Sequence, residues 1–430
     1  MASQSGNRSI YLPEPHRGQL AIHRHPARFK SVCCGRRWGK THYLTSVAVD
    51  GAVRGQFMGY FAPEYKFMAE AYEQALEIVA PLKKQSSKTE GVIRLKTGGR
   101  IDFWSLENEA AGRGRKYHGA LIDEAAFTKN STMSAIWQRA IKPTLLDYRG
   151  YAIAASTPNG IDPDNWFYQI NTDASQGFVK YHAPSHTNPH LPREELDLLE
   201  EQNHPMVFKQ EYLAEFIDWS GVAFFSLEYL LENNQPVPYP TWCDSVFAVI
   251  DSAVKSGSEH DGTAVVYCAY SKHVGIPLTI LDWDITQMEG AVLEEWLPSV
   301  RDKLEEFARL VGARLGVSGI HIEDKASGTI LLQQAMRREL PVHAIDSKLT
   351  QFGKDERAVS VSGYVYRNLV KLSENAYNKT SVYKGSSRNH LVAQLVQFRP
   401  GDKEHSRRAD DLLDCFTYSV AISLGNHGGY

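Results

Sequence analysis

A short basic loop near the N-terminus has the residue types of a phosphate-binding site. It reads Gly35-Arg36-Arg37-Trp38-Gly39-Lys40-Thr41 and follows Cys34, which ends a partly apolar run. A phosphate-binding loop needs backbone N–H groups at a helix start, a lysine for the outer phosphates and a hydroxyl for Mg²⁺. Lys40 and Thr41 stand in the last two positions, and we assign the whole loop to nucleotide binding. The strict pattern has glycine in place of Cys34, so the loop alone leaves open a strand-to-helix turn with incidental basic residues.

Two adjacent acids further along the chain strengthen this hypothesis. Asp123 and Glu124 come directly after the apolar run 120–122. In phosphoryl transfer, the first acid of such a pair helps to hold the metal and the second polarises the attacking water. An exposed acidic helix start would explain one acid more easily than two. We therefore predict hydrolysis of a nucleoside triphosphate. Thr41 and Asp123 would be the metal ligands, and Glu124 would be the catalytic carboxylate that polarises the attacking water.

Acidic residues in the C-terminal half have the pattern of a two-metal nuclease. Cutting a phosphodiester by that route needs three or more carboxylates that converge on two divalent ions, for which Mg²⁺ or Mn²⁺ is suited. Each acid alone has an ordinary explanation as a strand-end or helix-capping residue. Their order along the chain, however, is that of ribonuclease H: one after a first strand, two after a later strand and the rest at the start of a final helix. These candidates are Asp251, Glu323, Asp324, Asp410, Asp411 and Asp414.

Two choices among these acids stay open. Glu323 and Asp324 are adjacent, so a strand would point them to opposite faces. We favour Asp324 as the catalytic acid, with either residue as a possible metal ligand. Asp411 is favoured over Asp410 because Asp411 and Asp414 share one face of an ideal helix. Asp251 is the assignment that depends least on such choices.

The N-terminal half must form a sheet that positions the first set of residues. Short apolar runs alternate there with amphipathic stretches, which is typical of a parallel sheet covered by helices. The predicted strands cover residues 31–34, 59–62, 100–104, 120–122 and 151–155, and the predicted helices cover 41–53, 66–79 and 132–144. The acid-rich residues 193–216 are expected to be helical.

The C-terminal half is predicted to be a second α/β domain. Runs 246–250, 263–270 and 278–282 indicate a three-stranded meander, followed by a helix over 290–311, a strand over 319–322 and a final helix over 409–423. This order is that of a ribonuclease-H-like domain. Because residues 233–240 contain three prolines, we place a boundary there. The predicted domains are a P-loop ATPase core at 1–190, a helical lid and linker at 191–240 and a nuclease at 241–430.

Composition is that of a globular protein, with 43% hydrophobic and 23% charged residues. No apolar run approaches the ~18 residues that a membrane span needs, so we expect no membrane association. The five cysteines have no metal-like spacing and fit a reducing compartment without disulfides. The net charge of −3 does not by itself indicate nucleic acid. Residues 337–408 carry 14 Lys and Arg against 7 Asp and Glu, which fits either a solvated surface or a DNA-binding surface.

The motifs in order resemble the large terminase subunit of tailed bacteriophages. The matching segments are 35–41, Arg113-Gly114, 121–126, Ser156-Thr157-Pro158 and the C-terminal acids. That family also tolerates a residue other than glycine at the position of Cys34. The resemblance implies a P-loop ATPase with a parallel-rich sheet followed by a ribonuclease-H-like nuclease, with ATP and Mg²⁺ as cofactors and Mn²⁺ as a substitute at the nuclease site. In that family a glutamine upstream of the loop contacts adenine, and Gln19 is the matching residue.

The resemblance also implies roles for arginines around the ATP site. A guanidinium that reaches the γ-phosphate speeds phosphoryl transfer strongly, in cis or from a neighbouring subunit. Arg113 matches the family's Arg-Gly before the acid pair and is our choice for an arginine acting in trans. Arg37, or its neighbour Arg36, would sense the nucleotide in cis. Arg115 and Arg139 are competing candidates, and the glycines around Arg113 fit equally a flexible basic loop that touches DNA phosphate.

The resemblance predicts a viral DNA-packaging motor. The ATPase would drive double-stranded DNA into the procapsid, and the nuclease would cut the concatemer. Implied partners are the small terminase subunit, the portal protein of the procapsid and further copies of the chain in a ring, all in the host cell cytoplasm. The basic surplus would hold the phosphate backbone with little sequence reading.

Two other functions remain to be separated from this one. A helicase–nuclease of DNA repair or recombination would need helicase motifs and a second motor lobe after Ser156-Thr157-Pro158, where the nuclease acids begin too soon. A DNA-binding scaffold with decayed sites is the weakest alternative, because Lys40, Asp123, Asp251 and Asp411 are all retained.

Overall fold

The computed structural model describes residues 10–128, 130–219, 224–251, 262–286, 290–324, 327–351, 353–400 and 410–425. The chain divides into two compact units, one comprising Met1–Glu200 and Pro205–Asp218, the other Glu201–His204 and Trp219–Tyr430. Much of the predicted lid therefore belongs to the first unit, whereas the proline-rich residues 233–240 belong to the second. Within the described residues, no helix has the length and apolarity needed to cross a bilayer.

The first unit is built on an eight-stranded sheet in the order β3-β4-β5-β2-β6-β7-β1-β8. All neighbours from β5 to β8 pair in parallel, and β3 and β4 add an antiparallel edge beside β5. The strands are β1 Phe29–Cys34, β2 Phe57–Ala62, β3 Lys83–Ser87, β4 Val92–Leu95, β5 Arg100–Ser105, β6 Gly119–Asp123, β7 Tyr151–Ser156 and β8 Val179–Ala183. The predicted parallel-rich sheet is confirmed.

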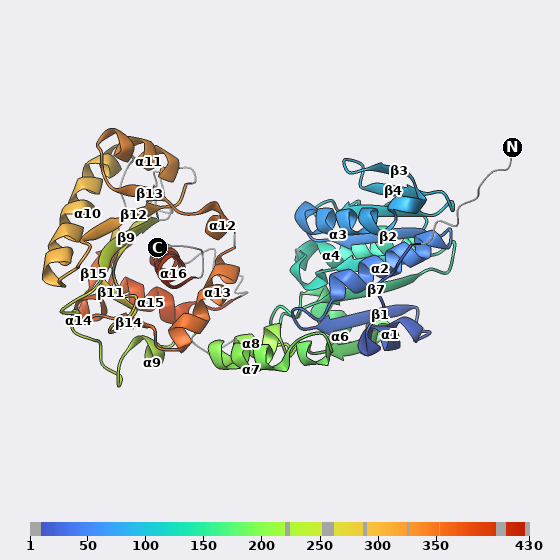
Figure 1. Cartoon of the computed structure of the whole chain (residues 1–430), viewed down its shortest axis with the longest axis horizontal. Helices are drawn as coiled ribbons and strands as arrows, with labels where there is room; N and C mark the ends of the chain where they lie inside the picture. Colours follow the sequence, from blue (N-terminus) through green and yellow to red (C-terminus); the bar gives the residue numbers. More distant parts are fainter. Residues whose placement is uncertain are drawn as a thin grey trace. The chain divides into compact units, whose positions relative to one another are not determined.

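Helices cover both faces of this sheet (Figure 1). Residues of β6 show why: Leu121 packs into the core under α2 and α3, whereas Ala120 and Ile122 pack into the core on the other face. Alternate side chains of a strand point to opposite faces, so a run of apolar residues fills two cores. The helices are α1 Arg17–Arg24, α2 Lys40–Val53, α3 Tyr65–Ile78, α4 Asn130–Ile136, α5 Lys142–Thr144, α6 Trp166–Thr172, α7 Arg193–Gln202 and α8 Pro205–Glu211.

The second unit has a six-stranded sheet in the order β13-β12-β9-β10-β11-β14. Strands β9, β10 and β11 form an antiparallel meander, and β12 pairs in parallel with β9. This is the mixed sheet predicted for a ribonuclease-H-like domain, and the meander is confirmed. The strands are β9 Ser245–Asp251, β10 Thr263–Tyr270, β11 Leu278–Thr286, β12 Val317–Ile322, β13 Val342–Ala344 and β14 Val370–Leu372, with a separate hairpin of β15 Ser381–Tyr383 and β16 Ser386–Arg388.

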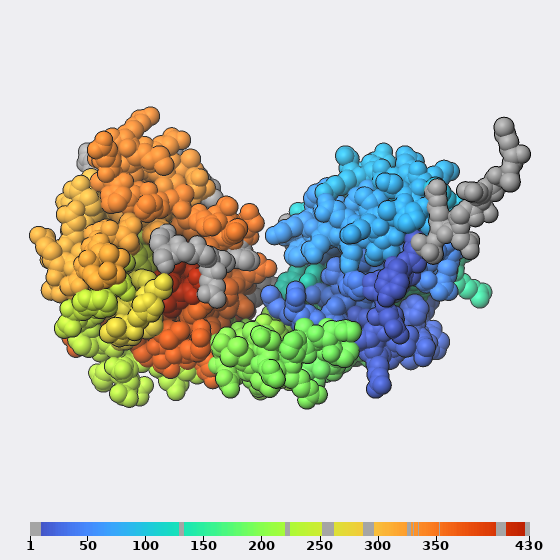
Figure 2. Space-filling model, in the orientation of Figure 1, coloured from blue at the N-terminus to red at the C-terminus, as the bar shows by residue number. Residues whose placement is uncertain are grey.

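The long helix α10 and the closing helix α16 pack on opposite faces of the second sheet. Leu297 and Val300 of α10 share a core with Ile250 and Tyr267. On the other face, the Cys415 thiol of α16 donates to the carbonyl of Ala264. In the space-filling view, the visible part of α16, in red, lies recessed within the second unit (Figure 2). The helices are α9 Leu227–Leu230, α10 Gly290–Leu310, α11 Ser327–Arg337, α12 Ser347–Thr350, α13 Lys354–Tyr366, α14 Glu374–Asn378, α15 His390–Gln397 and α16 Asp411–Leu424.

Candidate active sites

The predicted phosphate loop connects β1 to α2. Gly39 precedes the helix with a φ of 94°, a left-handed conformation that suits glycine, and Arg37 also has a positive φ of 62°. Gly35 is needed for a different reason. A Cβ at this position would lie 2.4 Å from both Ser185 Oγ and the carbonyl oxygen of Tyr212. The N–H groups at the start of α2 have no acceptor within the helix, so they form a ready anion-binding end.

Side chains from two other segments fix the carbonyl groups of this loop. The Ser185 hydroxyl donates to the carbonyl of Arg36 at 2.6 Å, and the Asn188 amide donates to that of Arg37 at 2.8 Å. The next two carbonyls, of Trp38 and Gly39, accept hydrogen bonds from His16 Nε2 and Gln19 Nε2, each at 3.2 Å. The His16 Nδ1 atom accepts from Gly18 N, so Nε2 carries the proton. Four successive carbonyls of the loop thus accept side-chain hydrogen bonds, and none of these side chains was predicted to act in this way.

The structure separates the loop residues into two groups. The amides of Gly35 and Arg36 donate to the carbonyls of Ala183 and Glu211, so they do not face an anion at the helix start. The Trp38 side chain is buried in the core, where its indole donates to Thr187 Oγ1 at 2.9 Å. The Trp38 amide also donates to the carbonyl of Gly35 at 3.3 Å, so the prediction of phosphate contact now applies to Arg37, Gly39, Lys40 and Thr41.

Gln19 lies against the loop rather than apart from it. Its Oε1 accepts from the backbone N–H of His16 at 3.2 Å, and its Nε2 donates to Gly39. The side chain is buried. These contacts show that Gln19 positions the loop, and the adenine contact implied by the resemblance stays a prediction.

The acid pair lies next to the loop at the end of β6. The Thr41 hydroxyl donates to Asp123 Oδ2 at 2.6 Å, and Lys40 Nζ lies 2.8 Å from Glu124 Oε1. Tyr60, in β2, also donates to Asp123 Oδ2 at 2.8 Å. The structure therefore brings together the loop hydroxyl, the lysine and both predicted acids, and it adds a tyrosine that the sequence did not identify.

Lys40 and Glu124 hold each other in a largely buried environment. Burial lowers the pKa of Lys40, but Glu124 and two other nearby groups raise it above its ordinary value overall. Burial raises the pKa of Glu124, and Lys40 only partly opposes this. Glu124 also has an unusual backbone, with a φ of 48°. The pKa of Glu124 therefore depends on whether Lys40 is paired with it.

Ser156 links the acid pair to the next strand. Its hydroxyl donates to Glu124 Oε2 at 3.4 Å and accepts from Ala126 N at 3.2 Å, while its carbonyl accepts from the Cys34 thiol at 3.7 Å. The start of the Ser-Thr-Pro motif therefore contacts both the acid pair and the residue that precedes the loop.

A cavity of about 460 Å³ opens directly over the loop. Its lining includes Lys40 and Thr41, and it extends to His42. The His42 Nδ1 atom lies 2.6 Å from Gln74 Nε2. Together with the free N–H groups of α2, this cavity is suited to a polyphosphate. The lining residues are Arg37, Gly39, Lys40, Thr41, His42, Glu70 and Gln74.

The arginines differ in which partners they already have. The Arg36 guanidinium pairs with Glu211, whereas Arg37 lines the cavity. Arg115 lies 3.8 Å from Asp102. Arg113 is exposed, and no ion pair binds its side chain within the described part of the chain. Arg37 is therefore better placed than Arg36 to meet a nucleotide, and Arg113 is freer than Arg115 to reach another molecule.

In the second unit, Asp251 lies among acids from two other elements. Burial raises the pKa of Asp251 well above its ordinary value, and Asp414, Asp411 and Glu323 raise it further. The Cys415 thiol hydrogen-bonds to the backbone of Asp251, which ties α16 to β9. The end of β9, the end of β12 and the first turn of α16 therefore converge, as the order of the acids predicted.

Glu323 and Asp324 lie in different surroundings. Glu323 hydrogen-bonds with Tyr418 of α16, and its charge raises the pKa of Asp251. Asp324 is exposed and accepts from Thr329 Oγ1 at 2.8 Å. These contacts therefore favour Glu323 over Asp324 as the acid that faces the cluster, because Glu323 interacts with Tyr418 and Asp251 whereas Asp324 bonds Thr329.

The three acids at the start of α16, where Asp410 is the N-cap residue, also differ in their contacts. Asp411 is buried and accepts from Gly262 N at 3.3 Å. Asp410 and Asp414 both pair with Lys354, and Asp414 pairs with Arg357 as well. Among these acids, Asp414 raises the pKa of Asp251 most, ahead of Asp411 and Glu323.

The chemistry of this acid cluster fits divalent metal, although basic groups now share it. Carboxylates are the ligands that Mg²⁺ and Mn²⁺ prefer, and after burial, which is the largest cause, Asp414, Asp411 and Glu323 raise the pKa of Asp251 further. Within the described residues, no three Asp, Glu, His or Cys side chains already converge closely enough to hold one ion. Lys354 and Arg357 provide the positive charge instead.

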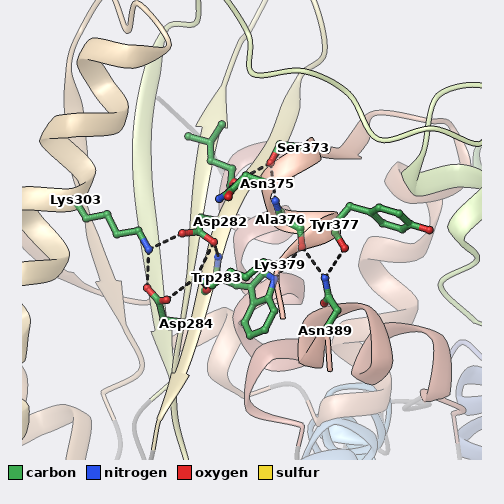
Figure 3. Close-up of polar contacts among 11 residues, drawn as sticks. Asp282, Trp283, Asp284, Lys303, Ser373, Asn375, Ala376, Tyr377, Lys379 and Asn389 are labelled. Atoms are coloured by element: carbon green, nitrogen blue, oxygen red, sulfur yellow. Dashed lines mark hydrogen bonds and ion pairs between the residues drawn. The ribbon is translucent and has the colours of Figure 1, made fainter. Parts of the chain in front are cut away.

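A second group of acids in this unit is fully neutralised by lysines. Asp282 and Asp284 on β11 are bridged by Lys303 and Lys379, with N···O distances between 2.5 and 2.9 Å (Figure 3). Burial raises the pKa of Asp284, but the two lysines outweigh it and lower that pKa overall. Two acids meet two bases, so this group joins α10 and the chain after α14 to β11. It has no excess charge for a metal.

The two units thus define a P-loop ATPase fold followed by a ribonuclease-H-like fold. Residues 32–229 match the family of terminase large subunits of T4likevirus type, N-terminal part. The large terminase subunits of Thermus phage G20c and Thermus virus P23-45 are each 27% identical over 258 residues, which is 51% of this chain and 52% of theirs. The matched part spans about half the length of these curated relatives.

A solved structure shows the same fold over nearly the whole chain. It is the large terminase of a thermophilic bacteriophage in complex with ADP, which is 12% identical, with a TM-score of 0.63 over 95% of this chain and 99% of that one. Residues 32–229 are thus similar to the N-terminal part of terminase large subunits, and the solved structure shows the fold of a large terminase over nearly the whole chain.

Proposed function

We propose that this chain is the motor and cutter of a viral DNA-packaging machine. It hydrolyses ATP to drive double-stranded DNA into a procapsid, and it cuts concatemeric DNA with a metal-dependent endonuclease. The observation that carries this proposal is the contact of Lys40 and Thr41, which line the loop cavity, with Glu124 and Asp123, in a domain that matches the terminase large-subunit model. The large terminase of the thermophilic bacteriophage, which has the same fold, was solved in complex with ADP, and this supports nucleotide binding by this chain.

The contacts of the first site indicate how hydrolysis would proceed. Thr41 and Asp123 would hold Mg²⁺, which neutralises phosphate charge when it is bound. Lys40 would exchange Glu124 for phosphate oxygens, because a triphosphate offers it more negative charge than one carboxylate. Glu124, released from Lys40, would then orient and polarise the attacking water. Arg37 would contact the nucleotide in cis, and Arg113 would act on the site of a neighbouring copy.

The second site would cut DNA through the acids around Asp251. We place Asp251, Glu323, Asp411 and Asp414 around the metal ions, with Asp410 at the edge. The ions would stabilise the attacking and leaving oxygens of the phosphodiester. The basic surplus of residues 337–408 would bind the DNA backbone. Sequence choice would come from the small terminase subunit, and a ring of copies would dock on the portal in the host cytoplasm.

A packaging assay tests this function directly. The full chain, the small subunit, procapsids and ATP should make double-stranded DNA resistant to added nuclease, and omission of ATP should prevent it. Strand separation of a forked duplex, without DNA protection, would instead support the helicase–nuclease alternative. No feature of the two units, as far as their residues are described, favours that alternative.

The contrast between Glu323 and Asp324 gives a prediction for the nuclease. Glu323→Gln should lower metal-dependent plasmid cleavage by about 10²-fold or more, because it removes an inward carboxylate from the cluster. Asp324→Asn should lower it by less than about threefold, since Asp324 is exposed and bonds Thr329. The measurement is the initial rate of plasmid nicking with Mn²⁺. The reverse order of effects would return the role to Asp324.

A further inference from the structure

A lysine occupies the place among the acids where a cation would be expected. Lys354, in the first turn of α13, pairs with Asp410, and its Nζ lies 3.4 Å from Asp414 Oδ2. Its positive charge also lowers the pKa of Asp251, against the effects of burial and of the neighbouring acids. One ammonium group therefore acts on acids from both α16 and β9.

The second basic group of the cluster has a different character. Arg357 is buried and pairs with Asp414. It also donates to Thr417 Oγ1 and to the Tyr418 hydroxyl, each at 3.0 Å, and its guanidinium lies 3.9 Å from the centre of the Tyr418 ring. Arg357 is thus fixed by several contacts that do not involve carboxylates, and it serves as a permanent part of the site.

Lys354 lacks such anchors. Its side chain is 27% exposed, and the only ion pairs that bind it within the described residues are those with Asp410 and Asp414. A flexible lysine at the rim of a site can turn toward water at little cost. The cluster therefore contains one fixed cation and one that can leave.

We propose that Lys354 is an internal competitor of divalent metal at the nuclease site. Its ammonium group holds Asp410 and Asp414 when no ion is bound, and it must withdraw before both carboxylates can bind one. Metal affinity is thereby kept low in the free protein, and the withdrawn ammonium becomes available to a DNA phosphate. This inference depends on the proposed metal site, but it concerns a residue that the two-metal mechanism does not require.

The test is metal binding to the full chain, measured by titration calorimetry with Mn²⁺ after removal of metal with a chelator. Lys354→Met keeps the length of the side chain and removes its charge. It should tighten Mn²⁺ binding by about tenfold, the order expected when a partly buried charged hydrogen bond no longer competes. The variant should also melt at a lower temperature than the parent in chelator, because two carboxylates lose a partner. Saturating Mn²⁺ should remove most of that difference.

Two further variants make the result specific. Lys354→Arg keeps the cation and should bind Mn²⁺ no more tightly than the parent protein. Lys348→Met removes an exposed lysine of α12 and controls for the general change in charge. Unchanged or weaker Mn²⁺ binding by Lys354→Met would overturn the inference while leaving the metal site intact. If no variant and not even the parent chain binds Mn²⁺, the proposed metal site itself is wrong.

Discussion

Lys40→Ala is expected to abolish ATP turnover and to leave the nuclease active. Lys40 lines the loop cavity and pairs with Glu124, and alanine can neither bind phosphate nor release Glu124 in exchange. Loss of such a preorganised charge lowers the rate by about 10³-fold or more. Metal-dependent plasmid cleavage should stay within about twofold of the parent, because the acids around Asp251 belong to the other unit. Both activities are measured on one preparation.

The variant must be shown to fold, because it leaves the carboxylate of Glu124 without its partner. A buried charged group that loses its partner costs stability, so a lower melting temperature of the first unit is expected. Lys180→Ala, at an exposed position of β8, is the matched control and should keep full ATPase activity. If Lys40→Ala loses both activities while its melting profile matches the control, the two sites are not separable and the proposal fails.

The sequence predicted the features that depend on local patterns. Apolar runs identified β1, β6 and β9 because a buried strand needs them, and the chemistry-bearing residues follow directly at the strand ends. Parallel pairing then brought Thr41 and Asp123 within 2.6 Å, although they are far apart in sequence. In the second unit the order of acids was enough to predict their convergence, because the ribonuclease-H-like sheet places these chain segments side by side.

Features that depend on contacts between distant segments could not be predicted. Nothing near Ser185 or Asn188 indicates that they hold carbonyls of the loop, since ordinary turn residues have the same composition. Tyr60 follows an apolar strand pattern and only the fold turns its hydroxyl toward Asp123. Strand alternation showed that Glu323 and Asp324 differ, but not which faces Asp251. A sequence offers no signal for that choice until the neighbouring helix is placed.

The same limit applies to the cations of the nuclease site. Lys354 and Arg357 lie more than fifty residues before Asp410 and Asp414, in a stretch whose basic surplus suggested only a surface for DNA. The fold shows that two of these basic residues bind acids of the site instead. Local charge counts therefore overstate the positive charge that is free to meet DNA.

Asp251→Asn is expected to abolish DNA cleavage and to leave ATP turnover unchanged. Asp251 interacts with Asp411, Asp414 and Glu323, so its replacement removes the one carboxylate that neighbours all three. Two-metal catalysis derives several kcal/mol of transition-state stabilisation from its ions, so a fall of about 10³-fold or more is expected in plasmid cleavage with Mn²⁺. ATPase activity of the same preparation should stay within about twofold of the parent.

The melting temperature of this variant gives a second, independent test. Burial and three nearby carboxyls raise the pKa of Asp251, so keeping it ionised at neutral pH costs folding free energy. The neutral amide removes that cost, and the melting temperature in chelator should rise rather than fall. The rise in melting temperature that Mn²⁺ gives to the parent should disappear. Asp302→Asn, at an exposed site on α10, should change neither property. Cleavage that persists in a clean Asp251→Asn preparation would remove this residue from the site, whatever happens to its stability.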